Sequence, residues 1–222
     1  MINILEDYIW RSVPEEPFRT NRNLRNKVDE NKKIQPYKGN TVVFLLDEDT
    51  NGKLAELQAE LYEAVPWMLA EKLHPDTFHM TLHSLVDGKP ETAGLAERMA
   101  EAEERAREIL AHWKDAPPLR MKATWTFNMV HTSVVLGLRP TDADDGDSWH
   151  RLDELYCALQ EVVPLGDLCP HITLAYYCPG EYTEEEAGRL RAALHPVEWE
   201  VELRMENLVI QNFEDMNHYR TV

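Results

Sequence analysis

The sequence predicts an α+β protein that is built from α/β-type repeats. Two observations lead to this prediction: apolar, β-branched segments alternate with segments of helical periodicity, and one strand–helix–strand order occurs twice. With 43% apolar residues over 222 positions, the chain can bury a full core. Its net charge of −17 disfavours tight, sequence-independent binding to long nucleic acid, because such binding needs clustered Lys and Arg side chains.

The first strand–helix–strand unit starts near Thr41. The run Thr41–Asp47 is short, apolar and β-branched and leads into a turn cluster, so it predicts a buried strand. Leucines then recur at helical spacing from Leu54 to Val65, and Pro66 ends that helix. The following strand carries the sequence Phe-His-Met-Thr-Leu at positions 78–82.

The second unit repeats this order. Ser133–Leu138 predicts a strand, residues 141–147 a polar loop, and the leucine spacing from Leu152 to Val162 a helix that ends before Pro164. The next strand carries Pro-His-Ile-Thr-Leu at positions 170–174. The two strand starts, Thr41 and Ser133, are 92 residues apart, as are the two motif histidines, so the halves are diverged copies.

The remaining segments complete the α+β pattern. A long helix is expected between the halves, followed by a strand, a further helix and C-terminal strands, at residues 92–113, 119–128, 184–194 and 198–212. We therefore expect an N-terminal extension, residues 1–40, and one domain, residues 41–222, whose repeat halves span 41–118 and 119–213.

The extension is rich in Asn and Pro and shows little periodicity, which predicts an irregular arm. Two interpretations remain open. The arm packs on the surface, or its basic residues lend positive potential to a neighbouring anion site. Those basic residues are Arg19, Arg22, Arg25, Lys27, Lys32 and Lys33.

The three cysteines lack both the spacing of a metal finger and the even count of a disulfide framework. No apolar run approaches the ~18 residues of a membrane span, and no basic signal segment begins the chain. We expect a cytoplasmic monomer without a cofactor, without a metal and without membrane contact.

The two His-x-Thr strands are the candidate site. Strand alternation predicts that His79, Thr81 and His83 share one face of the first strand, and that His171, Thr173 and Tyr177 share one face of the second. Two imidazoles that face each other can act as general base and general acid, while threonine hydroxyls donate to phosphate oxygens. This set is suited to phosphodiester chemistry. His83 and Tyr177 are candidate substrate contacts.

The paired motifs within repeated halves resemble the 2H phosphoesterase superfamily, the LigT-like group of 2′,5′ RNA ligases and cyclic nucleotide phosphodiesterases. The resemblance covers roughly residues 41–213. It implies a bilobal fold with two pseudo-symmetric, antiparallel-rich sheets, helices outside and a central groove. It also implies that His79 and His171 are the catalytic acid and base and that Thr81 and Thr173 bind the substrate phosphate.

We therefore expect a metal-independent phosphodiesterase that hydrolyses a cyclic or 2′,5′-linked nucleotide or a short RNA end. Two alternatives stay open. The same groove could serve a non-catalytic module that binds a nucleotide or phosphometabolite, or the chain could have 2′,5′ RNA ligase activity. The acidic charge disfavours the ligase, because ligation requires a grip on a longer RNA.

Overall fold

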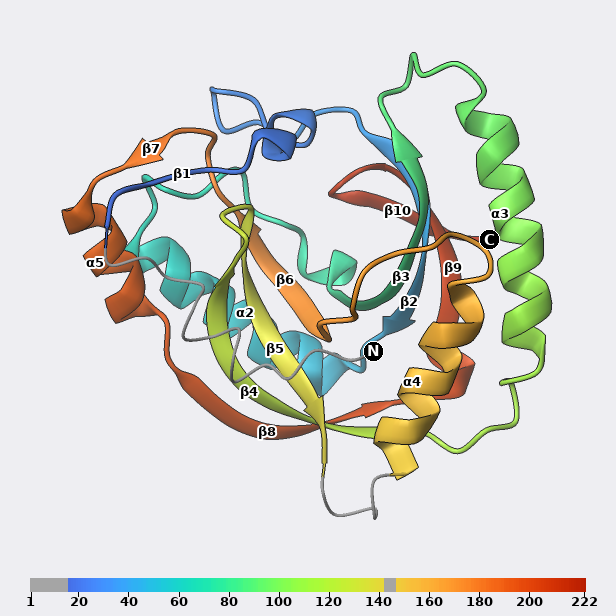
Figure 1. Ribbon diagram of the computed structural model, residues 1–222. Helices are drawn as coiled ribbons and strands as arrows, with labels where there is room; N and C mark the ends of the chain where they lie inside the picture. Colours follow the sequence, from blue (N-terminus) through green and yellow to red (C-terminus); the bar gives the residue numbers. More distant parts are fainter. Residues whose placement is uncertain (1–15, 142–146) are drawn as a thin grey trace.

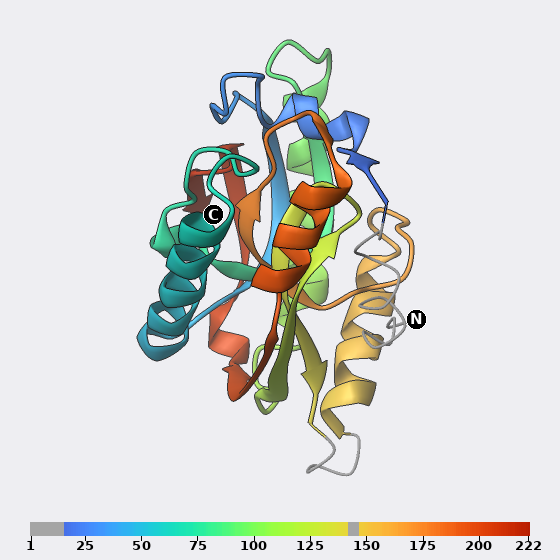
Figure 2. The same ribbon diagram turned by 90° about the vertical axis from the view of Figure 1, so that its left-hand side faces the viewer.

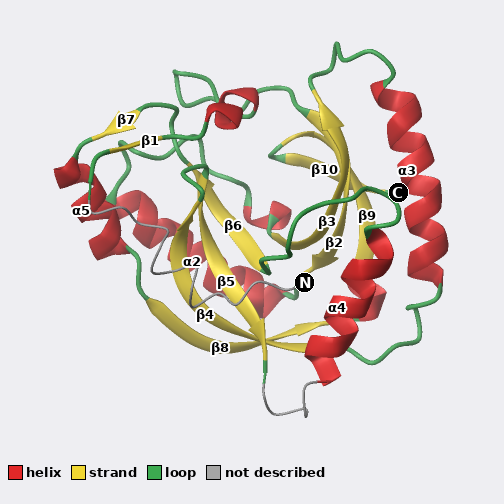
Figure 3. Cartoon of the chain, viewed as in Figure 1, coloured by secondary structure: helices red, strands yellow, loops and turns green. Residues whose placement is uncertain are grey.

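The computed structural model describes residues 16–141 and 147–222, and it confirms the α+β class (Figure 1, Figure 3). The α-helices are α2 (Glu48–Ala64), α3 (Leu95–Ala111), α4 (Asp147–Leu159) and α5 (Glu184–Ala193), and the 3₁₀-helices are η1 (Arg22–Asn26), η2 (Pro75–Thr77) and η4 (Met205–Asn207). The strands are β1 (Phe18–Arg19), β2 (Lys38–Leu45), β3 (His79–Gly88), β4 (Leu119–Met129), β5 (Ser133–Pro140), β6 (His171–Tyr176), β7 (Glu181–Tyr182), β8 (Pro196–Leu203), β9 (Leu208–Asp215) and β10 (His218–Thr221).

The main sheet consists of two antiparallel halves. Its strand order is β10-β9-β2-β3-β6-β5-β4-β8, so each half contributes four strands and the two motif strands lie at the centre. The halves join through the pair Met80–Ile172 between β3 and β6. Two pseudo-symmetric sheets were expected from the sequence; hydrogen bonding through this one pair makes them continuous.

Both predicted strand–helix–strand units are present, as β2-α2-β3 and β5-α4-β6. Helix α2 begins earlier than the leucine spacing indicates, because the Asp47 carboxylate caps it by accepting a hydrogen bond of 2.7 Å from the Thr50 N–H. Helix α5 begins with a capping box formed by Thr183 and Glu186. Most of the predicted polar loop, residues 142–146, lies outside the described residues.

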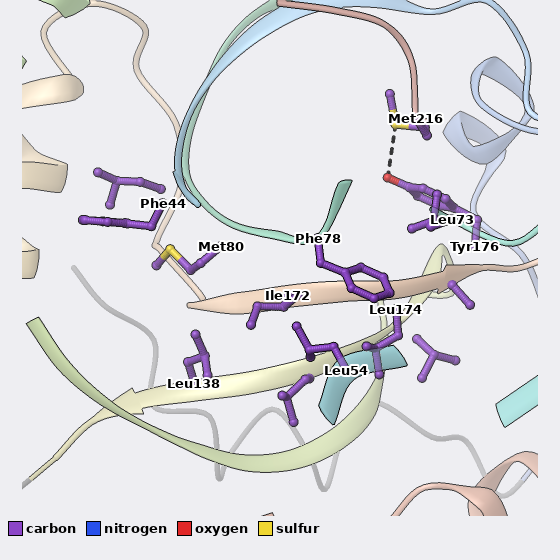
Figure 4. Close-up of a cluster of buried hydrophobic side chains, with 14 of the residues drawn as sticks. Phe44, Leu54, Leu73, Phe78, Met80, Leu138, Ile172, Leu174, Tyr176 and Met216 are labelled. Carbon is purple, nitrogen blue, oxygen red and sulfur yellow. Dashed lines mark hydrogen bonds between the residues drawn. The ribbon is translucent and has the colours of Figure 1, made fainter. Parts of the chain in front are cut away.

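Helices cover the outer faces of the two halves (Figure 1, Figure 2). Helix α3 packs on β2, β3 and β9 of the first half, whereas α2 packs on α5 and β6. The apolar core is continuous across the join, because Met80 and Ile172 are both fully buried within one cluster (Figure 4). This core fixes the motif strands side by side, which positions the candidate site.

The described part of the N-terminal arm contacts both halves. Strand β1 pairs with β7, the Asn21 N–H donates to the His131 carbonyl oxygen at 3.0 Å, and the Tyr37 N–H donates to the Glu214 carbonyl oxygen at 2.9 Å. Its apolar residues Leu24 and Val28 are fully buried in the main core. The described residues of the arm therefore pack into the fold through these side chains and hydrogen bonds.

None of the helices within residues 16–141 and 147–222 has the length and apolar content needed to cross a membrane.

Candidate active site

The two motif histidines are held by the same local device. His79 begins β3 and its ring Nδ1 lies 2.8 Å from the Thr77 carbonyl oxygen, while His171 begins β6 with Nδ1 2.6 Å from the Cys169 carbonyl oxygen. A carbonyl oxygen only accepts, so each Nδ1 carries the hydrogen and each neutral ring keeps an unprotonated Nε2. Both imidazoles are thus oriented to exchange a proton through Nε2.

Both histidines favour the neutral form. Burial lowers the pKa of His79 to about 4, with smaller contributions from the charges of His171 and Lys27, against the opposing effect of the Thr77 carbonyl. Burial also lowers the pKa of His171, again with Lys27 contributing. A bound anion would raise both pKa values, because it stabilises imidazolium. The charge of His171 is one cause of the lowered pKa of His79, so the two rings are close enough to interact electrostatically.

A pocket collects most of the predicted set. His79, Thr81 and Thr173 line it together, and His171 lies on the same face of β6, two residues before Thr173. Neither threonine hydroxyl forms a hydrogen bond with another described residue. Both hydroxyls can therefore donate to a ligand, as the sequence predicts.

A β-bulge occurs at the same place in both motif strands. The β2–β3 register passes from Val43–Thr81 to Val42–His83 and skips Leu82, and the β5–β6 register skips Leu174 in the same way. A bulge inserts one residue without a partner, so the following side chains change face. The regular alternation of side chains between the two faces of the sheet therefore ends directly after each His-x-Thr.

This bulge corrects the prediction for His83. The His83 side chain is 1% exposed and lies against Tyr156 of α4, with ring centroids 5.4 Å apart, and it is not among the residues that line the pocket. Ser84 occupies the groove face instead. The predicted shared face of His79, Thr81 and His83 assumed a regular strand, and that assumption was wrong.

The matching bulge in β6 corrects the prediction for Tyr177. Tyr177 is fully buried against Phe18 and Tyr182, with ring centroids 6.0 and 6.3 Å away, and does not line the pocket. Tyr176, to which the sequence assigned no role, lines it and donates its hydroxyl to the sulfur of Met216 at 3.2 Å (Figure 4). Only the cross-strand register distinguishes these two neighbouring tyrosines.

Segments beyond the two His-x-Thr motifs supply further pocket residues. The C-terminal hairpin brings the Tyr219 ring edge-on to His79 at 5.0 Å, with Phe213 at 5.4 Å from Tyr219. The arm brings Lys27, and the end of β3 brings Asp87, whose carboxylate accepts the Tyr37 hydroxyl at 2.5 Å. Lys27 was one of the six basic residues that the sequence analysis named. Phe213, Tyr219 and Asp87 gave no signal in the sequence.

No group of three His, Cys, Asp or Glu side chains among the described residues is arranged to hold a metal ion.

Comparison with known proteins agrees with this architecture. No family model matches the chain, and no curated protein sequence matches it. Among solved structures, a conserved protein of unknown function from Agrobacterium tumefaciens is 19% identical with a TM-score of 0.58, over 92% of this chain and 93% of that one.

Escherichia coli LigT gives a similar result. Its complex with ATP is 16% identical with a TM-score of 0.51, and its complex with 3′-AMP is 13% identical with a TM-score of 0.50; both cover 85% of this chain and 96% of LigT. At this identity the likeness concerns the fold. The chain thus has the LigT-like fold that the paired motifs predicted.

Proposed function

We propose that this chain is a two-histidine phosphodiesterase of the 2H phosphoesterase superfamily, acting on a cyclic or 2′,5′-linked nucleotide or a short RNA end. One observation carries the proposal: His79 and His171 each donate Nδ1–H to the carbonyl oxygen two residues earlier, which leaves Nε2 unprotonated on the strand face that also carries Thr81 or Thr173. Neither a packing role nor simple anion binding requires this matched orientation.

The proton transfers follow from this arrangement. The neutral histidine takes a proton from the attacking water or hydroxyl as its oxygen bonds to phosphorus, and the other, protonated histidine gives a proton to the oxygen that leaves as its bond to phosphorus breaks. Thr81 and Thr173 donate to the non-bridging oxygens throughout. The two imidazoles perform every proton transfer, so the scheme involves no metal.

We assign the base to His79. Its pKa is lowered to about 4, so its ring is neutral near pH 7 and ready to accept a proton. His171 then acts as the acid, because the bound phosphodiester anion raises its pKa and the ring takes up a proton from solvent. The scheme requires opposite protonation states and gives a bell-shaped pH profile.

Two features support a nucleotide as substrate. The Tyr219 ring lies next to His79, with Phe213 against Tyr219, where a nucleobase attached to the reacting phosphate can stack. LigT, which shares the fold, has been crystallised with ATP and with 3′-AMP. The pocket's few basic residues suit a small ligand better than a long RNA.

The test is hydrolysis, in excess chelator, of 2′,3′-cyclic mononucleotides, 2′,5′- and 3′,5′-linked dinucleotides and cyclic dinucleotides. The wild type is compared with the double variant His79→Asn/His171→Asn and with His150→Asn, a control at an exposed histidine of α4. We expect turnover of at least one class by the wild type and the control and none by the double variant.

Nucleotide binding without turnover by the wild type would instead indicate the binding module. Joining of RNA ends in preference to hydrolysis would indicate the ligase. Full activity of the double variant would refute the assigned roles.

A further inference from the structure

Lys27 is the one Lys or Arg side chain among the described residues that line the pocket of His79, Thr81 and Thr173. It comes from the N-terminal arm, outside the repeated halves. The remaining charged side chain of the lining, apart from the histidine, is Asp87. A chain with a net charge of −17 thus places a cation where the two His-x-Thr strands meet.

The arm holds Lys27 in place by backbone hydrogen bonds. The Lys27 N–H donates to the Leu24 carbonyl oxygen at 2.8 Å, and the Lys27 carbonyl oxygen accepts from the Gln35 N–H at 2.8 Å. Leu24, on the preceding turn, is fully buried in the core. The base of the side chain is therefore anchored at the edge of the groove.

The Lys27 ammonium group lies over two tyrosine rings at the groove. The Lys27 Nζ lies 5.8 Å from the ring centroid of Tyr37 and 5.4 Å from that of Tyr176. Tyr176 belongs to β6 and lines the same pocket, so the ammonium group extends from the arm across to the second half. Cation–π attraction stabilises the charge but leaves its hydrogen-bond donors free.

The ammonium group of Lys27 has no carboxylate partner within the described residues, whereas basic neighbours in the arm do. Arg25 pairs with Glu30 at 2.6 Å and Lys33 with Glu71 at 3.5 Å. The nearby Asp87 carboxylate accepts the Tyr37 hydroxyl. A half-buried cation without a counter-ion, beside two free threonine hydroxyls, is complementary to an anion.

We propose that Lys27 is a phosphate-binding residue of this site, whose ammonium group binds a non-bridging phosphate oxygen together with the hydroxyls of Thr81 and Thr173. The proposal rests on the proposed function for the identity of the anion as a phosphodiester. Negative charge on the non-bridging oxygens grows in the transition state, and the threonines are neutral donors. Lys27 supplies the fixed positive charge that the repeated strands lack.

Binding of inorganic phosphate, measured by titration calorimetry, tests this directly and requires no turnover. Lys27→Met keeps most of the length of the side chain and removes its charge, and Lys27→Arg keeps the charge. Lys33→Met is the matched control, since Lys33 is an exposed lysine of the same arm paired to Glu71. We expect about a tenfold or greater loss of affinity in Lys27→Met, near-wild-type affinity in Lys33→Met, and substantial rescue by Lys27→Arg.

Titration of the histidines by NMR distinguishes an electrostatic role of Lys27 from a purely structural one. Lys27 contributes to the lowered pKa of both His79 and His171, so Lys27→Met raises both values while Lys27→Arg leaves them low. If Lys27 only contributed packing contacts, the two histidine pKa values would not depend on the charge at position 27. Circular dichroism and thermal unfolding of each variant establish that it is folded.

The outcomes separate the two proposals. Phosphate affinity unchanged in Lys27→Met, or undetectable in the wild type at tens of millimolar phosphate, would overturn the role of Lys27 whatever the enzyme hydrolyses. If Lys27→Met loses phosphate affinity and the wild type hydrolyses none of the substrates, the role of Lys27 is supported and the phosphodiesterase activity is refuted. With a substrate in hand, we expect Lys27→Met to lower kcat more than it raises KM, because the charge develops in the transition state.

Discussion

The two halves of the molecule are alike in their chemistry and different in their surroundings. Each half has a His-x-Thr strand, a histidine whose Nδ1 is bonded to the carbonyl oxygen two residues earlier, and a bulge one residue after the threonine. All of these equivalences keep the 92-residue offset that the sequence shows. The repeat therefore supplies a matched histidine and threonine twice.

The surroundings differ because segments outside the two strand–helix–strand units lie next to the first of them. The arm places Lys27 and the C-terminal hairpin places Phe213, Met216 and Tyr219 in the pocket that contains His79. The second half contributes Thr173 and Tyr176 to this pocket. Two equivalent histidines thus lie in unequal surroundings, which would allow them to take the two different roles proposed above.

The two histidines are the strongest test of this asymmetry. We expect His79→Asn and His171→Asn each to lower turnover of the natural substrate by roughly 10²–10⁴-fold. With a p-nitrophenyl phosphodiester, whose leaving group needs no proton, His171→Asn should recover most of its loss and His79→Asn should not. Steady-state kinetics on both substrates measure this. The reverse pattern would exchange the roles, and equal losses on both substrates would refute the asymmetry.

The pH dependence of stability tests the buried state of His79. Its folded-state pKa is about 4 against an ordinary value of 6.5, so the unfolded chain binds the proton more readily. The contribution of neutral His79 to the free energy of unfolding is retained above pH 6.5 and is lost as the pH falls toward 4. The loss between pH 7 and pH 5 is about 2 kcal/mol. Urea unfolding at several pH values should therefore show a shallower slope in His79→Asn than in His150→Asn. An unchanged slope would mean that His79 is well solvated.

The threonines test whether the phosphate lies midway between the halves. Thr81→Val and Thr173→Val remove a hydroxyl while they preserve shape and strand preference, and each should lower kcat/KM by about 10- to 100-fold, because a hydrogen bond to a charged group is worth about 1.5–3 kcal/mol. Equal losses are expected for a phosphate centred on the join. A loss in one variant alone would place the phosphate on that half.

The aromatic wall tests the orientation of the substrate. Tyr219→Leu should raise KM for a nucleotide about tenfold, since stacking on a base is worth about 1–3 kcal/mol, and should leave KM for glycerol 1,2-cyclic phosphate unchanged. Tyr177→Phe is the control, because the buried Tyr177 hydroxyl has no hydrogen-bond partner among the described residues and its removal should not affect kinetics. An unchanged KM for the nucleotide in Tyr219→Leu would show that the base does not stack on this ring.

Gly39 tests how closely the first half is packed around Phe213. A Cβ at Gly39 would lie 2.5 Å from the Phe213 ring and 2.5 Å from the Val86 carbonyl oxygen, so Gly39→Ala should destabilise the protein by about 1–3 kcal/mol. Gly52→Ala, in helix α2 with nothing within 4 Å, should instead stabilise it by about 0.5–1 kcal/mol. Thermal unfolding gives both signs, and a neutral Gly39→Ala would show that β9 can shift.

The sequence by itself determined the α+β class, the repeated strand–helix–strand order and the two strands that begin with His79 and His171. These follow from local signals, because apolar periodicity sets each element and the 92-residue offset relates the halves. The face of each motif side chain was also correct as far as Thr81 and Thr173. Both remain on the groove side because the strands are regular up to that point.

The tertiary structure alone decided what surrounds the two histidines. The bulges that bury His83 and Tyr177 and expose Ser84 and Tyr176 to the pocket are properties of the register between strands, and one strand's sequence does not encode its partner's register. Lys27 reaches the groove because the arm's apolar side chains are buried in a core formed by both halves, and Tyr219 reaches it because β10 pairs with β9 beside β2. Such long-range contacts exist only once the chain has packed.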